Sequence, residues 1–161
     1  MTDAILVTGA AGFIGHHFVQ HVLDHTKYDV IALDRESMWG HFDPRVMLTH
    51  HDLQAPLWPL IPDSRRKSIH YVVNLAAESH VDRSIVDPVE FMRNNAVSAA
   101  NILDDTRKCL PEARFLHMST DEVYGCAESH KPFHEGDRFR PTNPYAASKM
   151  AAEALCPAYA N

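Results

Sequence analysis

The sequence has few cysteines and no long apolar run. Its three cysteines, Cys109, Cys126 and Cys156, are odd in number and form no Cys-x-x-Cys pair, so we expect neither a disulfide framework nor a structural zinc site. No apolar stretch reaches the roughly eighteen residues of a membrane span, and the N-terminus lacks the basic segment and cleavage site of a secretory leader. These absences predict a protein of the reducing cytoplasm, without a membrane partner.

An excess of basic residues is also missing. The 15 Lys and Arg residues stand against 21 Asp and Glu, for a formal net charge of −6, so nothing favours nucleic acid as a partner. Otherwise the composition is that of a globular protein, with 45% hydrophobic and 22% charged residues. The length favours a single domain, residues 1–161.

Short apolar runs alternate with longer amphipathic stretches along the chain. The predicted strands are 5–8, 30–33, 46–48, 71–75 and 114–119, and the predicted helices are 13–24, 88–109 and 143–155. Asp87-Pro88 and Asn143-Pro144 are typical helix starts, and Pro157 is expected to end the last helix. Apolar strands that alternate with helices indicate an α/β fold, a Rossmann-like doubly wound parallel sheet. In this fold ligands bind at the carboxyl ends of the strands, where the long loops 34–44 and 126–141 are expected to flank the crevice.

Three of the six glycines lie in one turn. Gly9, Gly12 and Gly15 follow the first predicted strand and open the first helix, with the spacing G-x-x-G-x-x-G. Glycine lets the backbone come close to a pyrophosphate, and the partial positive charge of a helix N-terminus favours the anion. The turn therefore predicts a dinucleotide-binding site.

Two acids follow the next strands. Asp34 ends the second strand, where a carboxylate can accept hydrogen bonds from both ribose hydroxyls and repels a 2′-phosphate, so NAD is favoured over NADP. Asp52 follows the third strand and can accept from the adenine amino group, with a turn-forming role as the alternative. On the first helix, His17, His21 and His25 are interpreted as a solvated polar face and not a zinc site, because no carboxylate completes a ligand set.

Two groups of polar residues come later in the chain. Tyr145 and Lys149 are four residues apart and so share one helix face, where the ammonium is expected to lower the pKa of the phenol and make it a general base. Thr120, Asp121 and Glu122 follow the fifth strand, and two carboxyls of which one is protonated form an acid/base pair. Only a local bend would point both carboxyls at one ligand.

Together these motifs resemble the extended short-chain dehydrogenase/reductase superfamily and, within it, the nucleotide-sugar 4,6-dehydratases that act on dTDP-glucose. The likeness rests on the segments 9–15, 74–85 and 119–125 and on Tyr145 with Lys149. The glycine turn and the Tyr-x-x-x-Lys pair belong to the whole superfamily. The segment 75–85 and the run Thr-Asp-Glu-Val-Tyr-Gly are more specific, and related epimerases and decarboxylases usually lack the Asp–Glu pair.

The resemblance implies a reaction in three steps with a catalytic NAD. Tyr145 takes the proton of the sugar 4-hydroxyl while hydride leaves C4, Thr120 hydrogen-bonds that hydroxyl, and Lys149 binds the cofactor ribose. Glu122 then removes the C5 proton and Asp121 protonates the departing C6 hydroxyl. Hydride returns to C6, and the implied product is a 4-keto-6-deoxy sugar nucleotide.

The family's binding positions carry over to a larger set of residues, with no metal among its ligands. The implied cofactor-binding residues are Gly9, Gly12, Phe13, Ile14, Gly15, Asp34, Asp52, Leu53, Leu75, Ala76, Ala77, Ser79, Asn94, Tyr145 and Lys149. The implied substrate contacts are Ser79 and Thr120. Asn94 stands where the family often has Thr. The helices 88–109 and 143–155 resemble the pair that forms the family's dimer interface, so a homodimer is expected.

Members of the family are much longer than this chain, which ends soon after Lys149. The later strands and the substrate domain are not in the sequence, so the fifth strand is expected to have an open edge. Three functions stay open: an NAD-dependent sugar-nucleotide dehydratase, another epimerase or decarboxylase of the superfamily, and a catalytically silent NAD-binding module.

Overall fold

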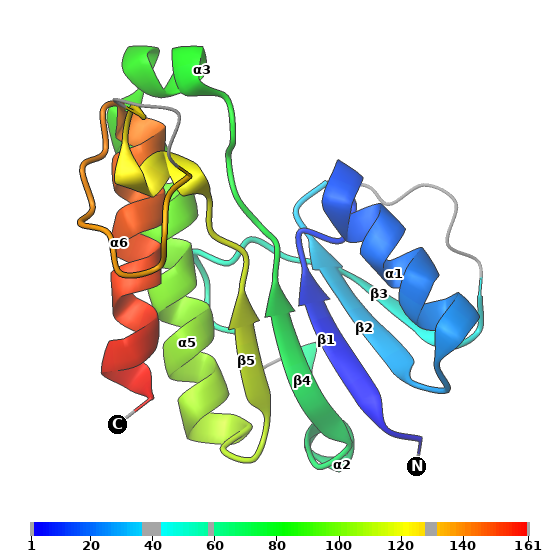
Figure 1. Cartoon of the computed structure of the whole chain (residues 1–161). Coiled ribbons are helices and arrows are strands. Elements are labelled where there is room, and N and C mark those ends of the chain that lie inside the picture. Colours follow the sequence, from blue (N-terminus) through cyan, green and yellow to red (C-terminus); the bar gives the residue numbers. More distant parts are fainter. Residues whose placement is uncertain (1, 37–42, 58–59, 128–131, 161) are drawn as a thin grey trace. The chain divides into compact units, whose positions relative to one another are not determined.

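The computed structural model describes residues 2–36, 43–57, 60–127 and 132–160 (Figure 1). The chain forms two compact units. The sheet unit consists of residues 1–77 and 101–118, and the helical unit consists of residues 78–100 and 119–161. A single domain over residues 1–161 stays a prediction. Parts of both long loops, residues 37–42 and 128–131, lie outside the described residues, so their place beside a ligand also stays a prediction.

Five parallel strands form the sheet, in the order β3-β2-β1-β4-β5. Their bounds are β1 (Ala4–Thr8), β2 (Asp29–Asp34), β3 (Val46–His50), β4 (Ile69–Asn74) and β5 (Arg114–His117). All five residues of the central strand β1 are buried between β2 and β4. The strand order reverses at β1, because the chain runs outward to β3 and then returns to the other side at β4. The predicted doubly wound parallel fold is confirmed, and this reversal is where such sheets bind ligands.

Apolar clusters cover both faces of the sheet. Helix α1 (Phe13–His25) packs Val19 and Val22 against Val7 and Val30 on one face. The opposite cluster contains Leu6, Ile31, Leu33, Val72, Leu57, Ile61 and Ile102. Ile102 comes from α5 (Ser98–Cys109), and Ile61 precedes the short helix α2 (Asp63–Arg66). Each fully buried aliphatic side chain contributes about 1.5–3 kcal/mol, so this burial stabilises the parallel sheet from both sides.

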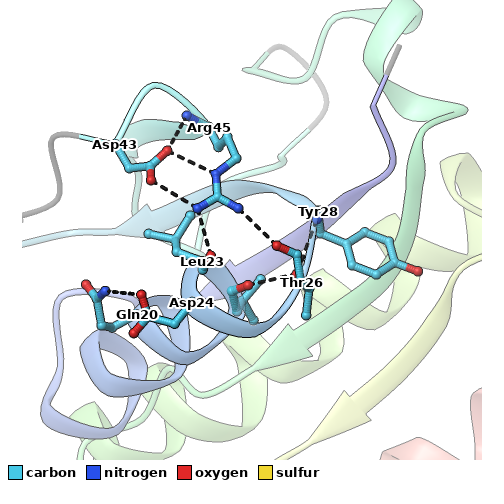
Figure 2. A network of polar contacts seen from close by, with 8 residues as sticks. Gln20, Leu23, Asp24, Thr26, Tyr28, Asp43 and Arg45 are labelled. Carbon is cyan, nitrogen blue, oxygen red and sulfur yellow. Dashed lines mark hydrogen bonds and ion pairs between the residues drawn. The ribbon is translucent and has the colours of Figure 1, made fainter.

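Arg45 fixes the carboxyl-terminal end of α1 (Figure 2). Its guanidinium donates to the carbonyl oxygens of Leu23 at 2.8 Å and Thr26 at 3.1 Å, and to the Asp43 carboxylate at 3.1 Å. The Thr26 hydroxyl donates to the Val22 carbonyl at 2.8 Å. Carbonyl groups at a helix end lack intrahelical donors and carry partial negative charge, so a cation there is favourable.

The helical unit contains a nearly continuous run of helix. α3 (Val81–Val86) is followed by α4 (Pro88–Phe91) and the π-helix η2 (Met92–Val97), which leads into α5. The predicted helix 88–109 is therefore helical throughout, but its middle is π-helical, which the sequence pattern did not indicate. The Asp87 side chain accepts from the Glu90 N–H at 3.1 Å, and this confirms the predicted start.

The last helix, α6 (Pro144–Tyr159), begins as predicted but ends later. The Asn143 side chain caps it, accepting from the Ala146 N–H at 2.8 Å. Pro157 lies inside the helix, so the expectation that it ends α6 is wrong. Close to a helix end a proline removes only one hydrogen bond, and the last turn closes with the Ala160 N–H on the Pro157 carbonyl at 3.3 Å. Among the helices of the described segments, none is long and apolar enough to cross a membrane.

Candidate functional site

The turn between β1 and α1 requires glycine at two positions. Gly9 has φ of +69°, and a Cβ added there would lie 2.6 Å from the backbone nitrogen of Ala76. A Cβ at Gly15 would lie 2.0 Å from the Gly9 carbonyl oxygen. Both distances are shorter than any real contact, so a side chain at Gly9 would collide with the segment after β4, and one at Gly15 would collide with the turn itself. The sequence placed this turn correctly between strand and helix.

The N-terminus of α1 is open to an anion. Gly12 is its N-cap, without a side-chain cap, and no acidic residue lies in the first turn. Phe13 and Ile14 in that turn are 82% and 54% exposed. Because the first N–H groups of a helix have no intrahelical acceptor, a 13-residue helix that starts this way suits a pyrophosphate. The residues of the turn therefore fit a dinucleotide.

The Asp34 carboxylate is part of the same turn. It ends β2, and its Oδ2 accepts from the Ala11 N–H at 2.8 Å while its Oδ1 accepts from the Glu36 N–H at 2.9 Å. The two bonds fix the orientation of the carboxylate. Each oxygen keeps a further lone pair that can accept from a hydroxyl, as the predicted contact with a ribose requires.

Asp52 and Leu53 lie in a turn that α5 holds in place. Asp52 Oδ1 accepts from the Gln54 N–H at 2.9 Å, so the turn-forming alternative is confirmed, and a contact with adenine stays a prediction. Leu53 is 9% exposed, and its carbonyl accepts from the Asn101 side chain at 2.9 Å. Asn101 was missed in the sequence, because an asparagine in a helix gives no sign of the loop it contacts.

The residues after β4 lie against the glycine turn. The Leu75 N–H donates to the Thr8 carbonyl at 3.2 Å, and the backbone of Ala76 adjoins Gly9. The structure therefore brings the glycine turn, Asp34, Leu75 and Ala76 together, and Ala77 follows at the end of the same segment.

Tyr145 and Lys149 are buried on α6, with 9% and 4% of their surfaces exposed. Burial raises the pKa of Tyr145, a hydrogen bond with Thr120 lowers it, and the charges of Glu122 and Asp121 raise it. The expectation of a lowered tyrosine pKa is therefore wrong for this structure, because burial and two carboxylates act against the phenolate. Burial likewise lowers the pKa of Lys149 to about 8, against the smaller opposing effects of Cys156 and Glu153.

Asp121 and Glu122 open the 3₁₀ helix η3 (Asp121–Tyr124), so the chain turns at the two carboxyls, and their approach to one ligand stays a prediction. Thr120 precedes it, and its hydroxyl oxygen accepts from the Glu122 N–H at 3.3 Å. Glu122 Oε2 accepts from the Asn143 side chain at 3.0 Å, which links the carboxylate to the N-terminus of α6. Asp121 is exposed. The structure thus brings Thr120 and Glu122 to the helix that carries Tyr145.

Two further implied binding residues, Ser79 and Asn94, also belong to the helical unit. Ser79 is exposed, and the Asn94 side chain is buried and donates to Glu90 Oε1 at 3.0 Å. The next residue of η2, Asn95, was missed in the sequence. Its side chain accepts from the Glu78 N–H at 2.8 Å and donates to Ser148 Oγ on α6 at 2.8 Å. A π-helix commonly marks a functional site, and here it buries two consecutive asparagines.

The histidines of α1 form a polar surface. The rings of His21 and His25 stack with their centroids 4.2 Å apart, and His17 Nδ1 lies 2.9 Å from the Phe13 carbonyl oxygen. In the part of the chain that the structure describes, no group of three or more His, Cys, Asp or Glu side chains is arranged to hold a metal ion.

Comparison with known proteins identifies the family. Residues 6–161 match the family described as GDP-mannose 4,6 dehydratase. The chain belongs to this family. The resemblance inferred from the sequence motifs is thereby confirmed at the level of nucleotide-sugar dehydratases and epimerases.

Individual relatives show the same likeness. A dTDP-glucose 4,6-dehydratase of Streptomyces antibioticus is 38% identical over 96% of this chain and 48% of its own length. The dTDP-glucose 4,6-dehydratase DesIV of Streptomyces venezuelae, solved with NAD bound, is 34% identical, with a TM-score of 0.82 over 97% of this chain and 51% of its own. A UDP-N-acetylglucosamine 4-epimerase of Methanobrevibacter ruminantium M1 is 25% identical, with a TM-score of 0.85 over 99% of this chain and 51% of its own. The chain spans about half the length of the curated relatives it matches.

Proposed function

We propose that this chain is the NAD-binding half of a nucleotide-sugar 4,6-dehydratase, with dTDP-glucose as the substrate. The observation that carries the proposal is the cluster of Thr120, Glu122 and Tyr145, in which the carboxylate is fixed at 3.0 Å by the N-cap of the tyrosine's own helix. A base beside a phenol suits a reaction that first oxidises an alcohol and then removes a proton next to the new carbonyl group.

NAD is the proposed cofactor, and when bound it would supply the hydride acceptor and donor that the reaction needs. The open N-terminus of α1 would hold its pyrophosphate, and Asp34, oriented by the Ala11 N–H, would accept from the adenosine ribose. The fixed carboxylate of Asp34 repels a 2′-phosphate, so NAD binds in preference to NADP. The cofactor-binding role of the other family positions, Ser79 and Asn94 included, is part of this proposal.

Tyr145 takes the proton of the 4-hydroxyl in the proposed first step. Its hydrogen bond with Thr120 favours the phenolate, while burial and the two carboxylates oppose it. A positive charge brought near the phenol on binding favours its ionisation, and the ammonium of Lys149 is proposed to hold the ribose beside it. Thr120 and Ser79 are the proposed contacts to the sugar.

Elimination of water is assigned to the two carboxyls. Glu122 has one oxygen on Asn143 and keeps the other for the C5 proton, which the 4-keto group makes acidic. Asp121 is exposed and donates a proton to the departing C6 hydroxyl. The Asp–Glu pair favours a dehydratase over an epimerase or decarboxylase, which usually lacks it.

A homodimer is proposed through the helices 88–109 and 143–155. The support is an apolar surface on α4 and η2, where Val89, Met92 and Val97 are 58%, 40% and 47% exposed. Apolar side chains grouped in this way mark an interaction surface. A cytoplasmic location is part of the same proposal, and so is the absence of a nucleic-acid partner, for which the support is the net charge of −6.

The test is a panel of sugar nucleotides incubated with the chain and NAD⁺ and analysed by NMR. The proposal expects a 4-keto-6-deoxy sugar from dTDP-glucose. Inversion at C4 without loss of water would instead identify an epimerase. Binding of NAD⁺ with no change in any sugar would identify a cofactor-binding module.

A further inference from the structure

A third polar residue follows Tyr145 and Lys149 on α6. Glu153 lies four residues after Lys149 and eight after Tyr145, so the three side chains share one face of the helix. Glu153 is half-buried, and its Oε2 accepts a hydrogen bond from the Ser119 hydroxyl. Ser119 opens the segment 119–125 that carries the family resemblance, but neither it nor Glu153 was given a role from the sequence.

The bond to Ser119 lies at one end of the turn that carries the two carboxyls. Ser119 directly precedes Thr120, and at the other end of the turn Glu122 is held by Asn143 at 3.0 Å. Both anchors come from α6, one from its N-cap and the other from its third turn. Hydrogen bonds to an ionised acceptor are about twice as strong as neutral ones, so the carboxylate of Glu153 is a firm anchor for Ser119.

Glu153 also follows a buried ammonium by four residues on the same face of α6. Lys149 is 4% exposed, and burial disfavours its charged form. Cys156 and then Glu153, both on α6, each raise the pKa of Lys149 against the effect of burial. Glu153 is the carboxylate of the two. Burial raises the pKa of Tyr124 in η3, and the charge of Glu153 raises it further.

We propose that Glu153 is a positioning residue with two roles: it holds Ser119, and with it Thr120, beside the face of α6 that carries Tyr145, and it supplies the counter-charge for Lys149. The importance of Thr120 and Lys149 rests on the proposed function. The two contacts of Glu153 themselves need neither cofactor nor substrate, so they can be tested separately.

Three variants separate the two roles. Glu153→Gln keeps an oxygen that can accept from Ser119 but removes the charge. Ser119→Ala keeps the charge but removes the hydrogen bond. Glu112→Gln, an exposed residue outside the helical unit, is the matched control for loss of one negative charge.

The first measurement is an NMR titration of the lysine side chains of the full chain, in which the Lys149 signal is assigned by its loss in Lys149→Arg. We expect Glu153→Gln to shift the pKa of Lys149 downward, and Ser119→Ala and Glu112→Gln to leave it in place. An unchanged titration in Glu153→Gln would overturn the role as counter-charge.

The second measurement is amide hydrogen exchange at Glu122 and Val123 in η3. We expect Ser119→Ala to speed this exchange about ten-fold, while Glu153→Gln, which keeps a weaker neutral hydrogen bond to Ser119, speeds it by a smaller factor. Equal exchange in Ser119→Ala and the unchanged chain would overturn the anchoring role. If both measurements agree with expectation but no sugar nucleotide reacts, the proposed function fails and this inference stands.

Discussion

At the scale of single residues, Lys149 and Tyr145 are titratable groups that burial pushes toward their neutral forms. Burial lowers the pKa of Lys149 to about 8 and raises that of Tyr145. Near neutral pH the lysine keeps its charge and the tyrosine keeps its proton. The pair alone is therefore a phenol beside an ammonium, and ionisation of the phenol requires further charge from bound molecules.

Lys149 makes the stability of the chain depend on alkaline pH. Its folded pKa of about 8 lies below the unfolded value near 10.5, so between these values the unfolded chain binds more protons. The free energy of unfolding should rise through that window, by at most ~1.4 kcal/mol per pH unit. Denaturant titrations at several pH values between about 7.5 and about 9.5 measure this rise in the free energy of unfolding. Lys149→Met should flatten the rise, and an equal rise in that variant would contradict the pKa direction.

Tyr145→Phe separates binding from proton transfer. The variant lacks the phenolic oxygen but keeps the ring, so NAD⁺ should still bind while turnover falls about 10²–10⁴-fold. Calorimetry measures the first and product formation the second. Asp34→Asn is the matched comparison, because it should weaken NAD⁺ and remove the discrimination against NADP⁺ without touching the helical unit. If Tyr145→Phe turned over substrate as fast as the unchanged chain, the tyrosine would be excluded as the base.

At the scale of elements, helix ends decide where the functional side chains lie. The sequence predicted both caps, Asp87 and Asn143, because Asx-Pro starts are a local signal. It did not predict the π-helix η2 or the passage of α6 through Pro157, because those depend on how the helix packs. The bend at η3 was required by the chemistry, but no residue pattern specified it.

Asn143→Ala should affect both stability and catalysis. Loss of the cap on α6 costs about 1 kcal/mol, seen as a lower Tm, and Glu122 loses its 3.0 Å donor. Asn143→Asp keeps the cap but places a second carboxylate beside Glu122. The Tm of Asn143→Asp should therefore be close to that of the unchanged chain, while turnover falls in both variants. Thermal melts and product formation measure the two effects. A normal turnover in Asn143→Ala would show that Glu122 needs no positioning.

The end of α1 in Figure 2 gives an acid-dependent contribution. Hydrogen bonds from Arg45 hold the pKa of Asp43 below its usual range. A carboxyl with a lowered folded pKa stabilises above its unfolded pKa, near 4, and that stability is lost as the pH falls. Arg45→Met should lower the Tm at pH 7 and reduce its decline on acidification. A decline as steep as in the unchanged chain would contradict the assignment.

At the scale of the whole molecule, the parallel sheet could be predicted from the sequence. Whether this chain carries out the whole reaction could not. Continuous apolar runs such as Ile5–Thr8 and Val30–Leu33 occur where a strand is buried on both faces, so these strands were found from sequence. Leu116 in β5 and Met118 just after it are 52% and 42% exposed, and among the described strands β5 pairs only with β4. An apolar edge of this kind invites a further strand.

The dimer proposal is tested by breaking the apolar surface on α4 and η2. The double variant Val89→Asp with Val97→Asp places two charges on side chains that are about half exposed, so the fold should tolerate them while a dimer should not. Sedimentation velocity should show a dimer for the unchanged chain and a monomer for the variant. Leu48→Lys, on the exposed part of β3, is the control that should stay dimeric. If the unchanged chain sediments as a monomer, the dimer proposal is contradicted.

The central claim is that the residues of this half-length chain form a dehydratase site, and mass spectrometry in D₂O tests it most directly. dTDP-glucose is incubated with the folded chain and NAD⁺. The account predicts a sugar nucleotide that has lost one water and gained one deuterium at C5, because the proton that Glu122 removes is replaced from solvent. The Glu122→Gln variant should lose this product. Unchanged dTDP-glucose, with a chain that is folded and binds NAD⁺, would contradict the claim.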